Sequence, residues 1–116
     1  EYDIDKFLIV ERSYSSGFGN QGNTVKIFSA DASQATNTLT MKDLKDKDFI
    51  SATKELLLDF EDFREKLSFG SVDNIEGITF GPTLPNGNKS LILVADNNFN
   101  TLGPQLNQFI LLEIAD

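Results

Sequence analysis

Short runs rich in Val, Ile, Leu and Phe recur along this 116-residue chain, and each run is bounded by Gly, Asn, Asp or Pro. Apolar runs of this length between turn-forming residues are typical of β-strands rather than of helices. They predict strands over residues 6–11, 24–30, 53–60, 75–80, 90–95 and 108–114. The chain is therefore expected to be an all-β protein built from antiparallel sheets.

Two of the predicted strands are apolar on both faces. Residues 7–10 and 91–94 are apolar at every position, and successive side chains of a strand point to opposite faces of the sheet. Strands of this kind are sandwiched between other layers, as in packed sheets or propeller blades. We also expect Phe69, Phe80 and Phe99 to lie in the hydrophobic core.

The connections between the strands carry turn, loop and helix signals. Residues 13–23 are rich in Ser, Gly and Asn and predict a long loop, whereas Pro-Asn-Gly at residues 85–87 predicts a tight turn between two strands. Residues 61–67 have a helical pattern, because acidic residues come first, basic residues follow, and Phe63 and Leu67 are spaced i, i+4. They predict a short helix of about two turns.

The predicted order is three strands, a short helix and three more strands. The two halves have a similar succession of strands and loops. The strand over residues 6–11 and the strand over residues 90–95 are each followed by a polar loop. We interpret these two strands as equivalent, each being the second strand of a four-stranded antiparallel unit. On this interpretation the N-terminal unit lacks its first strand and the C-terminal unit lacks its last.

Charge and composition exclude several functions. The formal net charge is −8 and the pI is about 4.4, so the field around the chain repels phosphate backbones and anionic lipid. Nucleic acid and membranes are therefore not expected as partners. The chain contains no Cys and no His, which excludes disulfides, thiolate nucleophiles and a Ser-His-Asp triad within it. The remaining oxygen donors are the ligands of hard cations such as calcium.

The apolar runs, the first residue and the absence of Cys bear on the cellular compartment of the protein. The runs over residues 7–10 and 91–95 are far too short for a membrane-spanning helix. The chain begins with Glu1 rather than Met, which we interpret as the mark of a fragment or a processed product. The absence of Cys is equally compatible with a secreted bacterial protein and a cytosolic one.

Several motifs resemble those of a known family, in its order and spacing. They are residues 10–14 (VERSY), 54–59 (KELLLD), 73–82 (DNIEGITFGP) and 91–99 (LILVADNNF), followed by Gln108 and Phe109. The chain resembles the bacterial phytase-like family, whose label is "esterase-like activity of phytase". The pairing of a DNIEG-type motif with a DNNF-type motif carries this resemblance.

The resemblance implies a fold and an activity. It implies that the chain corresponds to the C-terminal third of a β-propeller, with residues 1–60 and 73–116 as two partial blades and residues 61–72 as a short helix and linker. It also implies a secreted or periplasmic hydrolase that acts on phosphate or other esters. Because the upstream blades are missing from the resemblance, we expect no catalysis from this chain alone.

Two polar clusters lie at the ends of predicted strands. One precedes the strand over residues 75–80, and the other follows the strand over residues 90–95. Their members are Asp73, Asn74 and Glu76 in the first cluster, and Asp96, Asn97 and Asn98 in the second. In a propeller blade both clusters fall on the same rim, where their oxygens predict a calcium site. The alternative is that each cluster is an ordinary turn whose side chains bond their own backbone.

Glu11 and Arg12 leave the equivalent strand of the preceding partial blade, and the resemblance implies the same rim for them. Arg12 is then a candidate to bind a phosphate with two hydrogen bonds, and Lys54 is a less favoured helper because it starts a different strand. A salt bridge within the blade is the alternative reading for Glu11 and Arg12, and we prefer it to catalysis. A serine nucleophile is not expected, because the hydroxyls of residues 13–16 have no base nearby in sequence.

Two functions from different classes remain open. The chain is expected to be part of a calcium-assisted phosphoester or ester hydrolase, or else a non-catalytic binding or structural segment whose cation only confers rigidity. Partial blades leave strand edges and apolar faces exposed. We therefore expect the chain to associate with another chain that carries the remaining propeller blades, or to form a homo-oligomer through its exposed strand edges.

Overall fold

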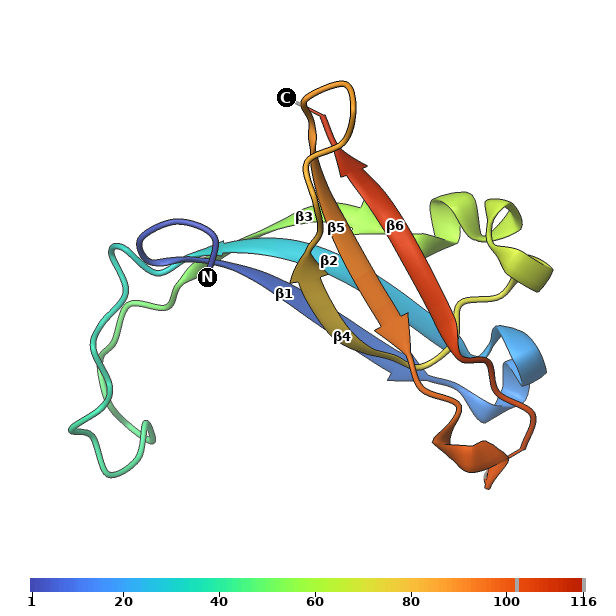
Figure 1. The fold of residues 1–116 in the computed structure, drawn as a ribbon. Helices are drawn as coiled ribbons and strands as arrows, with labels where there is room; N and C mark the ends of the chain where they lie inside the picture. Colours follow the sequence, from blue (N-terminus) through green and yellow to red (C-terminus); the bar gives the residue numbers. More distant parts are fainter. Residues whose placement is uncertain (102, 116) are drawn as a thin grey trace. The chain divides into compact units, whose positions relative to one another are not determined.

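The computed structural model describes residues 1–101 and 103–115 of the chain. It consists mainly of two three-stranded antiparallel sheets (Figure 1). The first sheet has the order β1 (Lys6–Tyr14), β2 (Asn23–Asp31) and β3 (Thr53–Asp59), and the second has the order β4 (Ile75–Phe80), β5 (Lys89–Ala95) and β6 (Gln108–Ile114). The 3-10 turns are η1 (Ser16–Gln21), η2 (Phe60–Lys66), η3 (Ser68–Gly70) and η4 (Asn98–Asn100).

The strand predictions are confirmed, with differences at the ends. Residues 75–80 and 108–114 match β4 and β6, and the other strands differ by one to three residues at an end. The largest difference is at β1, which continues to Tyr14. Its extension is paired with β2, since the hydroxyls of Ser13 and Thr24 lie 2.6 Å apart and the amide of Ser15 donates to the carbonyl of Gly22 at 2.8 Å.

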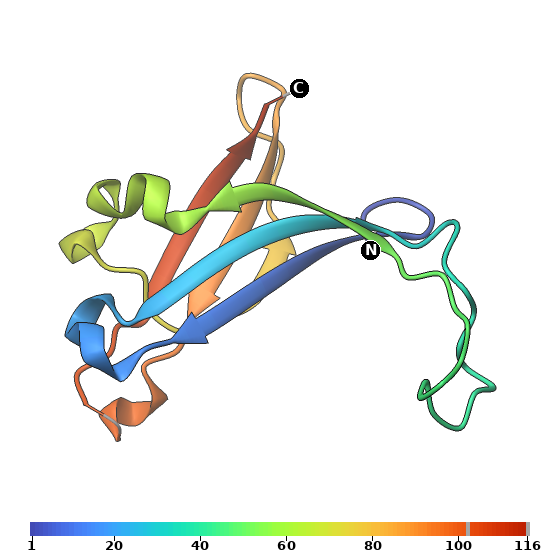
Figure 2. The ribbon, with the colours of Figure 1, turned by 180° about the vertical axis from the view of Figure 1, so that it is seen from behind.

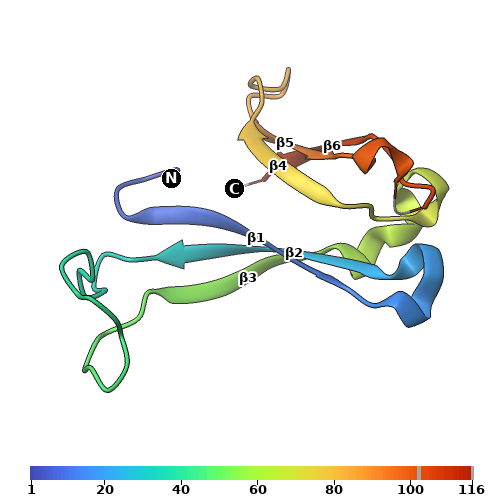
Figure 3. The same ribbon diagram turned by 90° about the horizontal axis from the view of Figure 1, so that it is seen from below.

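In the first sheet β2 lies between its two neighbours. Figure 2 shows β1 and β3 on either side of β2. Figure 3 shows η1 joining β1 and β2 at one end of this sheet, while the loop from β2 to β3 leaves from the other end. The pairing of β2 with β3 shifts register between Ile27 and Phe28, so a β-bulge interrupts the ladder there.

The predicted helix forms, but as a 3-10 segment with an interruption. Phe63 within η2 has φ −142° and ψ 20°, which is not helical. The rings of Phe63 and Phe60 pack together with their centroids 5.1 Å apart, and Phe60 is completely buried. Packing of the two rings therefore competes with the regular spacing on which the helix prediction was based.

Contacts divide the chain into two compact units. The first comprises Glu1–Glu11 and Lys26–Asp59, and the second comprises Arg12–Val25 and the chain from Phe60 onward. The second unit contains the whole β4–β5–β6 sheet, and its buried residues include Val25, Phe60, Val72 and Leu93. In the described part of the chain no helix is long and apolar enough to cross a membrane.

One face of the β4–β5–β6 sheet is buried and the other is not. Leu93 and its partner Ile110 are buried, as are Leu91 and Ala95 on the same face of β5. On the opposite face Ile92 and Val94 of β5 are half-buried, while the paired Leu111 and Phe109 of β6 are exposed. The expectation that strands with two apolar faces are covered on both sides is therefore not met by this chain itself.

The prediction that three phenylalanines belong to the core is wrong. The exposed fractions of Phe69, Phe80 and Phe99 are 88%, 45% and 91%. Phe69 and Phe99 lie in η3 and η4 with positive φ values of 63° and 54°, and Phe80 ends the edge strand β4. Their positions in turns and at an edge, rather than at alternating strand positions, place them outside the core.

Candidate polar site at the end of the second sheet

The two polar clusters meet at one end of the β4–β5–β6 sheet. The first residue of β4, Ile75, pairs with the last residue of β5, Ala95, so the chain enters β4 and leaves β5 at the same end. The amide of Asp96 donates to the backbone carbonyl of Asn74 at 3.4 Å. The antiparallel connectivity argued from the sequence therefore brings the clusters together as expected.

A β-bulge opens β4 at Glu76. Ile75 pairs with Ala95 and Gly77 pairs with Val94, so Glu76 is the extra residue on β4. Gly77 lies beside it. A Cβ atom at this position would lie 2.7 Å from Cγ1 of Val94, so a larger residue would force the two strands or the Val94 side chain to shift. Glu76 is exposed, and its carboxylate accepts a hydrogen bond from Nδ2 of Asn74.

Asp73 is buried and uses its carboxylate to fix the chain around it. Oδ2 accepts from the amide of Leu106 at 2.6 Å, and Oδ1 accepts from the amide of Asn74 at 2.7 Å and from Nε2 of Gln105 at 3.5 Å. Asn74 lies directly before β4, whereas Gln105 and Leu106 lie in the loop before β6. The bond from Asn74 is local, as in an ordinary turn, whereas the bond from Leu106 spans 33 positions of the sequence.

Asn74 is the most buried member of the clusters, with an exposed fraction of 4%. Its Nδ2 donates to Glu76, but its Oδ1 is buried and has no hydrogen-bond partner within the described residues. Buried polar atoms are nearly always hydrogen-bonded. Oδ1 of Asn74 is therefore an exception, a buried acceptor without a partner in the described chain.

The second cluster shapes the loop that follows β5. Oδ1 of Asn97 accepts from the amide of Phe99 at 3.1 Å and so caps η4. Nδ2 of Asn98 donates to Oε1 of Gln105 at 3.3 Å. Asp96 is exposed beside them, so two members of this cluster act as turn residues and the third leaves its carboxylate on the surface.

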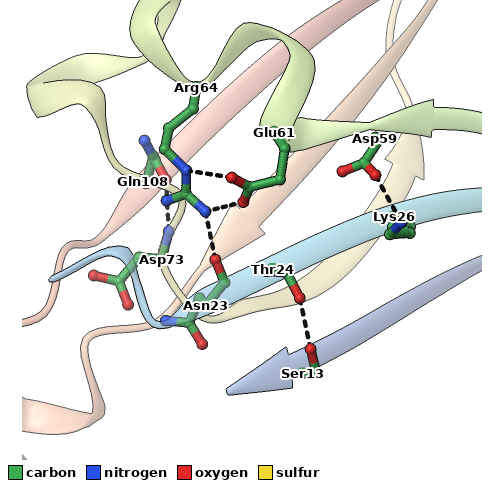
Figure 4. A network of polar contacts seen from close by, with 9 residues as sticks. All are labelled: Ser13, Asn23, Thr24, Lys26, Asp59, Glu61, Arg64, Asp73 and Gln108. Carbon is green, nitrogen blue, oxygen red and sulfur yellow. Dashed lines mark hydrogen bonds and ion pairs between the residues drawn. The ribbon is translucent and has the colours of Figure 1, made fainter. Parts of the chain in front are cut away.

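Gln108 and Arg64 are buried residues that the sequence did not single out as site residues. Gln108 supports this end of the sheet. Oε1 of Gln108 accepts from the amide of Asp73 at 3.3 Å (Figure 4). Its Nε2 donates to the carbonyl of Ser71 at 3.0 Å. Gln108 begins an apolar strand, and a polar residue at such a position is the only signal that could have identified it. Gln105 carries no such signal, since it lies in a polar loop.

The other buried residue is Arg64 of η2. Its Nη2 donates to the backbone carbonyl of Asn23 at 2.6 Å, and the guanidinium also binds the carboxylate of Glu61 (Figure 4). Nη1 of Arg64 is buried without a hydrogen-bond partner in the part of the chain that the structure describes. In the sequence this residue was one of the basic residues of the predicted helix, and the structure buries it.

The side chains of Glu11 and Arg12 have different partners. Glu11 forms an ion pair with Lys54 of β3, and Nζ of Lys54 lies 4.2 Å from the ring centroid of Phe28. Arg12 donates to Oδ1 of Asn23 at 3.5 Å. Glu11 belongs to the first compact unit and Arg12 to the second. A salt bridge within the sheet, the preferred reading for Glu11, is present with Lys54 as its partner.

The chemistry of the donors suits a hard cation, but their arrangement offers few free oxygens. Among residues 1–101 and 103–115, no group of three or more His, Cys, Asp and Glu side chains is placed to hold a metal ion. Asp73 is committed to backbone amides, which leaves Oδ1 of Asn74 with the carboxylates of Glu76 and Asp96 as the candidate donors. Calcium takes about six to eight oxygen ligands, which is more than these three side chains offer.

Comparison with known proteins identifies the family of this chain. The family model for phytase-like proteins, described as "esterase-like activity of phytase", matches residues 2–99. No curated protein and no solved structure matches the chain. The matched segment contains both polar clusters, and the chain therefore belongs to the phytase-like family described as having esterase-like activity of phytase.

Proposed function

We propose that this chain is part of a hydrolase that acts on phosphate or other esters, and that calcium assists it at the polar end of the β4–β5–β6 sheet. Family membership supports the reaction class. The observation that carries the cation is Oδ1 of Asn74, which is buried without a partner in the described chain. An unsatisfied buried acceptor costs about 1–3 kcal/mol, and a bound cation would remove that cost.

The candidate ligands divide into holding and positioning groups. Asn74 and Glu76, which are already hydrogen-bonded to one another, would hold the ion together with the exposed Asp96. Asp73 positions the following loop through its bond to Leu106, as Asn97 and Asn98 do within that loop. When bound, calcium would neutralise the acids and act as a Lewis acid toward an ester oxygen.

We propose that further propeller blades complete the site, either in another chain or in a second copy of this one. Exposed Phe109 and Leu111 on the second face of the sheet support this proposal, as does the position of β6 at the sheet edge. Catalysis then belongs to the complete assembly. A secreted or periplasmic location is proposed on the same family grounds.

The second candidate function is a non-catalytic propeller segment in which the cation only makes the loops rigid. The use of the Asp73 carboxylate as an acceptor for backbone amides favours this candidate. Both candidate functions include a bound cation, but only the hydrolase turns over a substrate. A stability measurement and an activity measurement are therefore both needed.

The stability experiment is thermal unfolding of the protein with and without calcium. At a calcium concentration about a hundred times the Kd, binding should raise the unfolding free energy by about 2.7 kcal/mol. Asn74→Leu removes the open acceptor and should abolish this gain, whereas Asn37→Leu, at an exposed position in the β2–β3 loop, should keep it. No calcium effect on the full-length protein would contradict the metal site.

The activity experiment uses 4-nitrophenyl phosphate and 4-nitrophenyl acetate with the full-length protein. Calcium-dependent release of 4-nitrophenol that is lost in Asn74→Leu supports the hydrolase. Stabilisation by calcium without turnover of either compound favours the rigidifying cation instead.

A further inference from the structure

The turn between β4 and β5 contains the dipeptide Asn86–Gly87. Asn86 is the only asparagine of the sequence that is followed by glycine, and it is exposed. Asparagine is one of the thermolabile residues, because the backbone nitrogen of the next residue can attack its side-chain amide. Glycine hinders this attack least, since it has no side chain. The turn therefore presents a pair of residues prone to chemical modification at the surface.

Two hydrogen bonds hold the side chain of Asn86 in place. Its Nδ2 donates to Oε1 of Glu113 at 2.6 Å, and its Oδ1 accepts from the amide of Asn88 at 3.1 Å. Nδ2 of Asn88 donates to the same carboxylate oxygen at 2.6 Å. The turn is thus attached to β6 through one acceptor atom, and Asn86 supplies one of its donors.

The nitrogen that would attack is hydrogen-bonded as well. The amide of Gly87 donates to the carbonyl of Leu84 at 2.9 Å, and the amide of Leu84 donates to the carbonyl of Asn88 at 2.8 Å. The bonds of an exposed turn open locally at a free energy well below that of global unfolding. Among the bonds that must open, the one from Asn86 to the carboxylate is charge-assisted and therefore the strongest.

We propose that Asn86 is a site of spontaneous deamidation in the folded protein, and that its bond to Glu113 sets the rate. The Gly87 nitrogen loses its proton and forms a bond to Cγ of Asn86. The bond from Cγ to Nδ2 breaks, and ammonia leaves with that proton. Water then opens the cyclic imide at either carbonyl, which gives aspartate or isoaspartate at position 86. This inference is independent of the proposed hydrolase.

The modification releases the turn from β6. A carboxylate at position 86 is ionised at neutral pH and has no proton to donate, so the bond to Oε1 of Glu113 is lost and two negative charges face one another. Isoaspartate also adds a carbon atom to the backbone of the turn, which changes the geometry of the bond between Leu84 and Asn88. Of the two bonds to Glu113, the one from Asn88 remains.

The rate is measured by peptide mass spectrometry of the full-length protein after incubation in mildly alkaline buffer. Asn86 should deamidate faster than Asn37, which is also exposed but precedes threonine. Glu113→Leu should raise the rate at Asn86 about fivefold, the factor equivalent to one hydrogen bond. Leu111→Ala, at another exposed position of β6, is the matched control and should leave the rate unchanged.

The consequence is measured by urea denaturation. Asn86→Asp reproduces one product and should lower the folding equilibrium constant about fivefold. Asn86→Ala loses the bond without adding a charge and should lower it less. Wild-type protein aged until Asn86 is modified should unfold at a lower urea concentration than fresh protein.

Four results would overturn the inference. The first is an intact Asn86 in the folded protein under conditions in which the urea-unfolded chain deamidates. The others are faster reaction at Asn37, equal rates in wild type and Glu113→Leu, and equal stability of wild type and Asn86→Asp. Glu113→Gln keeps one acceptor oxygen and should give an intermediate rate, so the comparison holds even where Glu113→Leu does not fold.

Discussion

The carboxylate of Asp73 accepts a hydrogen bond of 2.6 Å from the backbone amide of Leu106, a residue 33 positions away in the sequence. The bond links the start of β4 to the loop before β6. It explains why a polar cluster is buried at a strand end, since the carboxylate replaces the backbone pairing that the loop cannot make. The same bond gives the loop that carries Phe99 a fixed attachment point.

Asp73→Asn should lower the free energy of unfolding by about 1–3 kcal/mol, because an amide nitrogen would face either Leu106 or Asn74 and leave a buried donor without an acceptor. Urea denaturation measures the change. Asp96→Asn, at an exposed position of the same sheet end, is the control and should stay within about 0.5 kcal/mol of wild type. Equal effects of the two substitutions would contradict the role given to Asp73.

Arg64 joins η2 to the start of β2 through the carbonyl of Asn23. Arg64→Met keeps most of the side-chain volume but leaves this carbonyl without its donor, so we expect a loss of about 1–3 kcal/mol in unfolding free energy. Lys66→Met, at an exposed position of the same segment, is the matched control and should be nearly neutral. A neutral Arg64→Met would show that burial of the guanidinium costs as much as its bonds contribute.

The positions of the strands were predictable from the sequence. The burial of polar residues that depend on distant hydrogen-bond partners was not. Residues 75–80 were assigned correctly because short apolar runs and the turn residues that bound them are local signals. The meeting of Asp73 with the residues after β5 followed from antiparallel connectivity. In contrast, burial of Arg64 and Gln108 depends on backbone carbonyls and amides that are 35 or more positions away, and no local pattern encodes them.

Arg64 and Gln108 are polar residues that the structure buries, whereas Phe69 and Phe99 are apolar residues that it exposes. Phe69 and Phe99 were assigned to the core on hydrophobicity alone, yet both lie in turns with left-handed backbone. The turn residues around them, Gly70 after Phe69 and Asn98 and Asn100 beside Phe99, are tolerant of that backbone. Weighing these neighbours above the hydrophobicity of the ring would have placed both side chains on the surface.

Gly77 allows β4 to pack closely against β5 next to the bulge. Gly77→Ala would place a Cβ atom 2.7 Å from Cγ1 of Val94, and such overpacking costs about 1–3 kcal/mol. Gly17→Ala is the control, because nothing lies within 4 Å of its added Cβ. The double variant Gly77→Ala with Val94→Ala should recover part of the loss. Thermal unfolding of the wild type, Gly77→Ala, Val94→Ala and the double variant gives the coupling. Additive effects in the cycle would contradict a direct contact.

Glu113 of β6 clamps the turn between β4 and β5, because Nδ2 of Asn86 and Nδ2 of Asn88 both donate to its Oε1 at 2.6 Å. The bond from Asn88, and then that from Asn86, lowers the pKa of the Glu113 carboxyl below its usual value. Since the folded-state pKa is the lower one, the clamp stabilises the fold above the unfolded pKa of glutamate, and this contribution is lost as the pH falls through the folded pKa.

Carbon-detected NMR titration of Glu113 should show the lowered pKa in the wild type and a value nearer to that of free glutamate in Asn88→Ala, while Asn37→Ala leaves it unchanged. Acid unfolding should follow the same order, with Asn88→Ala unfolding at a higher pH. An identical Glu113 titration in wild type and Asn88→Ala would contradict the clamp.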